Sequence, residues 1–367
     1  MQQKILIITN SHRPDDSRVY QKIAKSLAKK YQILILYSHI IDVDNENNIE
    51  FVNLKSNDKI VFKTKALDII YDHKPQLIIC VEPYTLLIGN IALKKHNIPF
   101  IYDCHEFFAE AFADRFKIGK YTLEKIYSIT EMFLYKKAAG VITVNDILVE
   151  KMRKHNTNTI ACANFPDYSV LELEATNKEY DLIYIGGISQ AKGLQLMLEL
   201  VHYAIEQSFT LNLLILGTYL IEKEEQLAYD LVRKLDIKAF VTIKKTVPSN
   251  DVYLYIKKAK IGLSLLNPNT KRYQKAIPLK LLEYMKEGLP VVANNFPIVS
   301  KVVTENNAGF CVDFDVEMTF NAVKKLLSDE ELYLRYSQNA KMTIKEKYNW
   351  QNEEKKLLLL VDRVINE

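Results

Sequence analysis

The feature that most constrains the fold is a regular alternation of short apolar runs with helical patterns, which starts at the first residues. The runs are apolar throughout, so they predict strands that are buried on both faces rather than half-exposed strands. Helices that separate such strands cover both faces of a parallel sheet. The sequence therefore predicts the doubly wound α/β class, with Rossmann-like domains.

The alternation weakens once, over residues 164–180, where a proline and several acidic residues interrupt the pattern. It then restarts and continues to the C-terminus. A chain of 367 residues is long for one domain and sufficient for two. We therefore expect a domain over 1–164 and a second over 165–349. The expected strands are 5–9, 33–37, 76–81, 99–103, 140–144, 181–185, 211–216, 240–243, 261–266, 290–293 and 309–312.

The helical patterns lie between these runs. The expected helices are 16–30, 66–71, 86–96, 121–138, 145–154, 194–204, 252–259 and 279–286, with further helices after residue 312. Two such units in tandem would place the carboxyl ends of both sheets around a common crevice.

Charge and segment composition exclude several classes of protein. A net charge of +4 without a basic stripe argues against a nucleic-acid partner. The N-terminus has no signal-peptide pattern, and no apolar run reaches the ~18 residues of a membrane span. We expect a cytoplasmic protein that is at most peripheral to the inner face of a membrane. Four scattered cysteines without metal-ligand spacing suggest reduced thiols.

The turn after the strand 181–185 has the composition of a phosphate site. Gly186 and Gly187 let the backbone approach a ligand, and Ser189 follows in the same turn. Lys192 and Gly193 stand near the start of the next helix, whose N-terminus favours anions. The segment predicts a diphosphate site, although a plain glycine turn would give the same pattern.

A second candidate segment runs from Pro278 to Pro290. Pro278 suits the first helical position, and the amides of Leu279 and Lys280 would point outward toward phosphate. Lys280 and Glu283 are three residues apart, so they neighbour each other on the helix surface. Glu283 is placed to accept hydrogen bonds from ribose hydroxyls. A surface ion pair is the alternative interpretation.

A third candidate is His105, which follows the strand 99–103. In a doubly wound sheet this end of a strand borders the ligand crevice, so His105 could contact the reacting group. A structural histidine is the alternative. The same region holds Phe107, Phe108, Phe112 and Phe116 near Arg115, Lys117 and Lys120. These residues predict either a membrane-facing acceptor loop or a helix packed inward.

Taken in order, these segments resemble glycosyltransferase family 4, whose retaining enzymes have the two-domain GT-B fold. The likeness covers nearly the whole chain. The landmarks are Asp16-Ser17-Arg18, Asp103-Cys104-His105-Glu106, 139–144, Asn164-Phe165-Pro166, 186–193, 278–290 and Tyr348-Asn349-Trp350.

The resemblance implies a sugar transferase that uses a nucleotide-diphosphate sugar of the UDP or GDP type and a saccharide or lipid-linked acceptor, in cell-surface polysaccharide assembly. It implies a C-terminal helix, 350–367, that crosses back to the first domain. It places His105 and Lys192 in the catalytic site. It also implies retention of the anomeric configuration, since only Glu82 and Glu106 stand at strand ends as candidate bases.

Two positions depart from the family pattern. Gly187 stands where the family often has arginine, and Lys275 stands where the first glutamate of an E-x7-E motif is expected. The segment also contains Lys271 and Arg272, so Arg272 or Lys275 could supply the missing charge near phosphate or sugar. The cationic side chains and helix N-termini could neutralise the leaving diphosphate, so we expect no metal cofactor. A nucleotide-sugar epimerase of the same fold and a degenerate nucleotide-binding partner subunit remain as alternatives.

Overall fold

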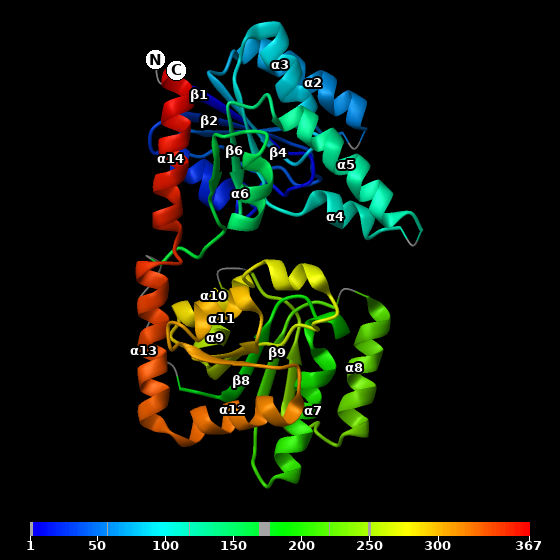
Figure 1. Cartoon of the computed structure of the whole chain (residues 1–367), viewed down its shortest axis with the longest axis vertical. Helices are drawn as coiled ribbons and strands as arrows, with labels where there is room; N and C mark the ends of the chain where they lie inside the picture. Colours follow the sequence, from blue (N-terminus) through cyan, green and yellow to red (C-terminus); the bar gives the residue numbers. More distant parts are fainter. Residues whose placement is uncertain (1–2, 57, 117, 169–176, 220, 249–250) are drawn as a thin grey trace. The chain divides into compact units, whose positions relative to one another are not determined.

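The computed structural model (Figure 1) describes residues 3–56, 58–116, 118–168, 177–219, 221–248 and 251–367, with the backbone alone at 271 and 272. The chain divides into two compact units. The first unit is Met1–Asn164 with Trp350–Glu367, and the second is Phe165–Asn349.

The described part of the first unit is built on a seven-stranded parallel sheet of order β3-β2-β1-β4-β5-β6-β7. The chain moves from β1 outward to β3 and returns through β4, so the strand order reverses between β1 and β4. Ligand sites of such sheets lie at the carboxyl ends beside this reversal. The strands are β1 (Lys4–Ile8), β2 (Gln32–Tyr37), β3 (Ile49–Asn53), β4 (Leu77–Val81), β5 (Phe100–Cys104), β6 (Gly140–Thr143) and β7 (Thr159–Ala161).

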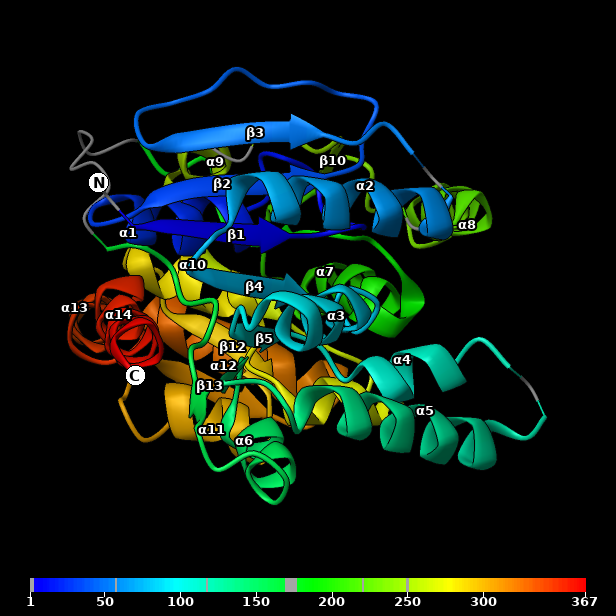
Figure 2. The same cartoon turned by 90° about the horizontal axis from the view of Figure 1, so that it is seen from above.

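Helices cover both faces of this sheet, as the buried strands require. In Figure 2, α2 (Lys59–His73) and α3 (Leu86–His96) lie over β1, β2 and β4. The end of α5 (Lys120–Tyr135) and α6 (Asp146–Arg153) share that face. The other face is covered by η1 (Val19–Ala24), α1 (Lys25–Ala28) and α14 (Trp350–Asn366).

The C-terminal helix α14 is part of the first unit, as predicted. Leu357 and Val361 are fully buried in the core that η1 and α1 share with the sheet. The Trp350 indole Nε1 donates to Ser26 Oγ at 2.9 Å, and the amide of Ala163 donates to Glu353 Oε2 at 2.9 Å. These contacts bind the last helix to the first and last segments of 1–164.

The second unit repeats the architecture with a six-stranded parallel sheet of order β10-β9-β8-β11-β12-β13 in its described part. Its strand order reverses between β8 and β11. The strands are β8 (Tyr180–Ile185), β9 (Leu213–Leu216), β10 (Val241–Lys244), β11 (Ala259–Ser264), β12 (Val291–Asn294) and β13 (Gly309–Val312). The predicted doubly wound class is therefore confirmed in both units.

Two groups of helices cover the two faces of the second sheet. One face carries α7 (Leu194–Glu206), α8 (Glu222–Lys234) and α12 (Val316–Ser328). The other carries α9 (Val252–Lys257), α10 (Leu279–Lys286), α11 (Pro297–Val303) and α13 (Glu330–Glu346). Two short 3-10 turns, η2 (Gln190–Lys192) and η4 (Lys271–Lys275), lie in the loops after β8 and β11.

Several elements differ from the sequence prediction. The helix expected over 66–71 begins at Lys59, because the Asp58 side chain caps it by accepting from the amides of Ile60 and Val61. The helix expected from 16 begins at Val19, since Asp16 caps the amides of Arg18 and Val19. The strands β3 and β7 and the helix α8 were not expected. The connection predicted over 164–180 includes 169–176, which lie outside the described residues.

None of the described helices is long and apolar enough to cross a membrane.

Candidate active site

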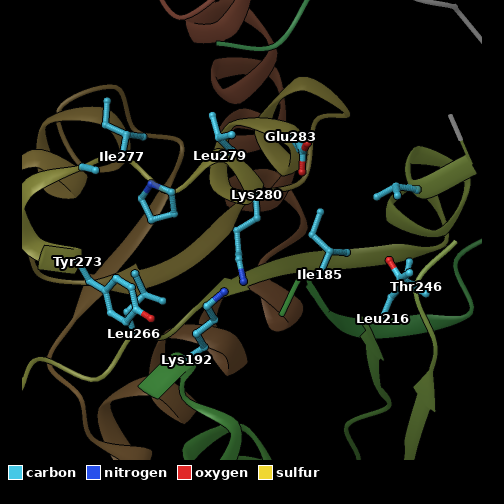
Figure 3. Close-up of a pocket in the computed structure, with 14 residues that line it drawn as sticks. Ile185, Lys192, Leu216, Thr246, Leu266, Tyr273, Ile277, Leu279, Lys280 and Glu283 are labelled. Atoms are coloured by element: carbon cyan, nitrogen blue, oxygen red, sulfur yellow. The ribbon is translucent and has the colours of Figure 1, made fainter. Parts of the chain in front are cut away.

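A pocket of about 480 Å³ opens in the second unit at the carboxyl edge of its sheet (Figure 3). Its walls come from the turn after β8, the ends of β9 and β11, the η4 segment and the start of α10. It therefore lies beside the reversal of strand order between β8 and β11, where such folds bind their ligands.

The turn after β8 has a backbone that requires glycine. Gly186 has φ +112° and Gly193 has φ +82°, both in the left-handed region. A Cβ at Gly193 would lie 1.8 Å from the carbonyl oxygen of Leu265, so any side chain there would displace the loop after β11. The Tyr184 hydroxyl donates to the Gly187 carbonyl at 2.6 Å, and this hydrogen bond holds the turn against the end of β8.

The helix α10 begins at the pocket wall. Pro278, which the sequence places in the first helical position, instead occupies the N-cap position with an extended backbone (φ −64°, ψ 124°). The helix starts at Leu279, and the amide of Leu281 donates to the Pro278 carbonyl at 3.0 Å. The amides of Leu279 and Lys280 belong to the first turn, so they have no acceptor within the helix and can bind an anion.

The Lys280 side chain does not lie on the helix surface, where the alternative interpretation of a surface ion pair with Glu283 would place it. The Lys280 amino group turns into the pocket, with Nζ 3.5 Å from the centre of the Tyr184 ring, whereas Glu283 is exposed at the pocket wall. Burial lowers the pKa of Lys280 well below its ordinary value; the charge of Lys192 adds to this, and Glu283 opposes it.

The predicted donor-binding residues fall into two groups. Gly187 and Ser189 belong to the turn after β8 but are not among the residues that line the pocket. Ser189 is 5% exposed, and its hydroxyl has no hydrogen-bond partner among the described residues. The predicted residues that do line the pocket are Gly186, Lys192, Leu279, Lys280 and Glu283.

The basic segment before α10, residues 271–275, is described only in part. The side chain of Arg272 lies outside what the structure describes. Lys275 ends η4 but does not line the pocket, although its neighbours Tyr273 and Ala276 do. The role of Arg272 or Lys275 near phosphate or sugar therefore stays a prediction.

In the first unit, two sequence landmarks meet at the carboxyl edge of the sheet. Arg18 and Asp103 form a buried ion pair, with Arg18 Nε donating to Asp103 Oδ2 at 2.9 Å and Nη2 to Oδ1 at 2.5 Å. Arg18 Nη1 also donates to the carbonyl of Cys162 at 3.0 Å. Both charges are satisfied internally, so this pair holds the loop after β1 and the segment after β7 to the end of β5.

His105 lies in a polar cluster beside this ion pair. Its Nε2 lies 3.1 Å from Nε2 of His12, so one imidazole donates and the other accepts. His12 Nδ1 lies 3.1 Å from Asp16 Oδ2, and His12 Nε2 lies 3.2 Å from Glu82 Oε1. Glu82 directly follows β4 and has a left-handed backbone, with φ +67°; its side chain also accepts from Ser11 Oγ at 2.6 Å.

The two histidines have opposite pKa shifts. Burial lowers the pKa of His105 to about 4, despite the nearby charge of Asp103. Burial also lowers that of His12, but the hydrogen bond to Asp16 and the charge of Glu82 outweigh it, so the pKa of His12 is raised. These directions favour His12 as the donor of the pair, with neutral His105 accepting at Nε2. The Nδ1 of His105 is buried without a hydrogen-bond partner among the described residues.

Sequence reasoning missed His12 and used Glu82 only as a candidate base. The signal that could have found both is the strand order. The loops after β1 and β4 flank the reversal in the first sheet, so their polar residues border any site there.

Comparison with known proteins identifies the class of enzyme. Residues 170–343, which include the pocket, match the family described as glycosyl transferases group 1. The chain is also 27% identical over 346 residues to an uncharacterized glycosyltransferase of Haemophilus influenzae, covering 89% of this chain and 90% of the relative.

This chain is a glycosyltransferase.

Solved structures show the same fold as this glycosyltransferase. A sucrose-phosphate synthase from Thermosynechococcus elongatus matches with a TM-score of 0.77 and 14% identity, over 100% of both chains. Anabaena Alr3699/HepE in complex with UDP-glucose matches with a TM-score of 0.73 and 14% identity, over 98% of this chain and 99% of the other. The glycosyltransferase therefore has the GT-B fold, with its group 1 match in the unit that contains the pocket.

Proposed function

We propose that this glycosyltransferase moves a sugar from a UDP- or GDP-type nucleotide-diphosphate sugar to a saccharide or lipid-linked acceptor. The observation that carries the proposal is the set of groups around one pocket. Two lysine side chains, the first-turn amides of α10 and one carboxylate line it together. That set matches a diphosphate joined to a ribose.

Each group has a distinct role in this proposal. The leaving diphosphate gains negative charge as the glycosidic bond breaks, and Lys192 with the amides of Leu279 and Lys280 stabilises that charge. Glu283 accepts hydrogen bonds from the ribose hydroxyls. The backbone of Gly186 allows the diphosphate to approach the turn. We assign His105 of the first unit to the transferred sugar, and the resemblance to family 4 supports this role.

The solved structures of Anabaena HepE support the donor type, since their ligands include UDP and UDP-glucose. A thermal-shift screen of UDP, GDP and ADP tests the donor base. A nucleotide present at 100 times its Kd stabilises the folded state by about 2.7 kcal/mol, which raises Tm measurably. The proposal fails if none of these nucleotides raises Tm.

Product analysis separates the transferase from an epimerase. A transferase releases the nucleoside diphosphate in proportion to the acceptor glycosylated, whereas an epimerase returns an isomer that is still nucleotide-linked. Chromatography of the nucleotide products with and without acceptor distinguishes the two outcomes.

We further propose that the reaction retains the anomeric configuration, in line with the resemblance to glycosyltransferase family 4. Inversion requires a general base opposite the leaving group. Of the two candidates, Glu82 is held by Thr9, Ser11 and His12, and Glu106 is exposed. Proton NMR of the first product tests this, because an inverted anomeric coupling would contradict both retention and family 4.

We also propose that no divalent metal is needed, because lysines and helix amides take the part of a metal ion at the diphosphate. Equal rates with EDTA and with added magnesium or manganese are the expected result. Loss of activity in EDTA with recovery in either metal would refute the proposal.

For the acceptor, we propose a role in cell-surface polysaccharide assembly at the inner face of a membrane. The hairpin of α4 (Phe108–Ala113) and α5 supports it, because its tip exposes Phe116, Ile118 and Tyr121 beside Lys120. Phe112 instead packs against Tyr127, with ring centres 5.0 Å apart. Of the phenylalanines named from the sequence, Phe116 is thus an exposed contact and Phe112 is half-buried; Lys117 lies outside the described residues.

A further inference from the structure

We propose that the Lys280 side chain is a neutral amine in the free donor pocket, which takes up a proton when a diphosphate binds and then forms an ion pair with it. The proposal rests on the proposed function, because it concerns the same pocket. It adds that donor binding is coupled to the uptake of a proton.

The position of Lys280 Nζ points to a ligand. The atom has almost no exposed surface and no hydrogen-bond partner among the described residues, although it lines a pocket. A buried ammonium without an acceptor is costly, so a lysine is stable there only if a ligand supplies the acceptor or if the amine is neutral. The Tyr184 ring, 3.5 Å below Nζ, compensates only part of this cost.

The site that Nζ reaches is the diphosphate turn. A Cβ built on Gly186 would lie 3.4 Å from Nζ and 3.7 Å from Cε of Lys280, so the side chain ends against the exposed face of that glycine. Figure 3 shows the Lys192 and Lys280 side chains pointing toward each other from opposite walls. A diphosphate over Gly186 would contact both nitrogens.

Charge explains why the proton is taken up on binding. In the free protein, burial and the charge of Lys192 lower the pKa of Lys280 well below its ordinary value, against the attraction of Glu283. A diphosphate reverses the sign of the local charge and supplies oxygen acceptors, so it raises that pKa. At a pH between the two values, the amine of the free protein takes one proton from the buffer and the complex holds an ammonium.

Among the described side chains, the pocket offers no better candidate for this role. Lys192 and Lys280 are the cationic residues that line it in the described part of the chain. Position 187, next to Gly186, carries no side chain. Lys280 thus supplies a second charge beside that of Lys192, which position 187 does not provide.

The experiment is isothermal titration calorimetry of UDP, GDP and inorganic pyrophosphate in buffers of different ionisation enthalpy. A pH near 8.5 suits it, because an ordinary lysine with a pKa of about 10.4 is protonated there. The proteins are the wild type, Lys280→Arg, Lys280→Met and, as a control on the same helix, Lys286→Met. Protons lost by the ligand itself cancel in the difference between wild type and variant.

The wild type is expected to take up more protons per ligand than Lys280→Arg, which stays charged and binds without uptake. Lys280→Met should bind roughly 10- to 100-fold more weakly, the loss expected for a hydrogen bond to a charged group. Its Tm without ligand should not fall, because methionine removes a buried amine. Lys286→Met should match the wild type in both measurements.

Equal proton uptake by wild type and Lys280→Met, together with equal affinity, would overturn the inference. If UDP or GDP binds in that case, the proposed function stands without it. If pyrophosphate binds with Lys280-dependent uptake and no nucleotide binds, the inference holds and the nucleotide-sugar donor is wrong.

Discussion

At the scale of single residues, the pocket contains two kinds of side chain: some form hydrogen bonds that stabilise the fold, and others are placed to bind a ligand. The Tyr284 hydroxyl accepts from the amide of Ile185, at the end of β8, at 2.8 Å. The Tyr184 hydroxyl donates to the carbonyl of Gly187, in the turn that follows, at 2.6 Å. Glu283 and Lys280 lie one helical turn apart, with Glu283 exposed and the Lys280 amine buried in the pocket. Substitutions at these two positions should therefore affect binding more than stability.

Glu283→Ala is expected to weaken nucleotide binding by roughly 10- to 100-fold, because hydrogen bonds to a charged group contribute about 1.5–3 kcal/mol. Tm without ligand should stay near the wild-type value, since the side chain is exposed. Calorimetry with UDP and GDP measures the effect. Glu305→Ala, another exposed glutamate of the same unit, is the control. Unchanged affinity of Glu283→Ala would remove this residue from the site.

The paired histidines give a prediction in pH. His105, with a pKa of about 4, should stay neutral from pH 5.5 upward, whereas His12 should titrate above the ordinary value of 6.5. The raised pKa means that His12 stabilises the fold below about pH 6.5, and this contribution disappears as the pH rises through its folded pKa. The lowered pKa of His105 has the opposite effect, a loss of stability as the pH falls from about 6.5 toward 4.

NMR of the ring protons over pH 4 to 8 checks this assignment. Glu82→Gln should lower the pKa of His12, because it removes a carboxylate 3.2 Å from Nε2. One shared midpoint near the ordinary histidine value, unaffected by Glu82→Gln, would contradict the pairing.

His105→Ala should reduce kcat far more than it changes nucleotide affinity, since we assign His105 to the transferred sugar. Steady-state kinetics together with calorimetry separates the two effects. Equal losses in kcat and in UDP affinity would instead indicate that the substitution disturbs the donor pocket as a whole.

At the scale of elements, periodicity predicted the buried strands and failed where burial is slight. β4 and β5 are buried at every residue and were predicted within one residue at each end. β3 is an edge strand whose last three residues are half-buried, and β7 has three residues, so neither gives a clear apolar run. In α8 only Ala228 and Val232 are buried, but Leu227, Leu231 and Leu235 extend them to an apolar stripe at helical spacing, so this helix was open to prediction from the sequence.

In the candidate site, the sequence predicted which residues take part, but not the contacts that depend on packing between elements. The sequence named Lys192, Lys280 and Glu283 because they stand at element ends, where spacing is informative. It misplaced the Lys280 side chain, whose direction depends on the Tyr184 ring from another element. It also missed the contact of His12 with His105, because their loops become neighbours only through the strand order β1-β4-β5.

The α4–α5 hairpin gives a prediction for membranes. Ile118→Asp should reduce sedimentation of the protein with vesicles that contain anionic lipid, because Ile118 is 89% exposed at the hairpin tip beside Lys120. Ile40→Asp is a matched control, since Ile40 is 94% exposed on another loop of the same unit. Equal binding by the wild type and both variants would exclude the tip as the contact.

At the scale of the whole molecule, the C-terminal helix α14 completes the hydrophobic core of the first unit. Leu357→Ala should destabilise that unit by about 2–5 kcal/mol, because the residue is 0% exposed in the core. Leu359→Ala on the same helix should change stability by less than about 0.5 kcal/mol, since Leu359 is 68% exposed. Urea unfolding of both variants tests the difference. Similar values for the two would mean that α14 does not pack as described.

The chain passes from one unit to the other twice, at 164–165 and at 349–350, so the second unit is an insertion within the first. On the ribosome, residues 1–164 of the first unit are therefore synthesised before the whole of the second unit, and α14 is synthesised last. The apolar surface of η1 and α1 that later packs on Leu357 and Val361 stays uncovered until α14 emerges. The unit made second can complete its core first, and during that interval the nascent first unit exposes an apolar surface of the kind that favours aggregation.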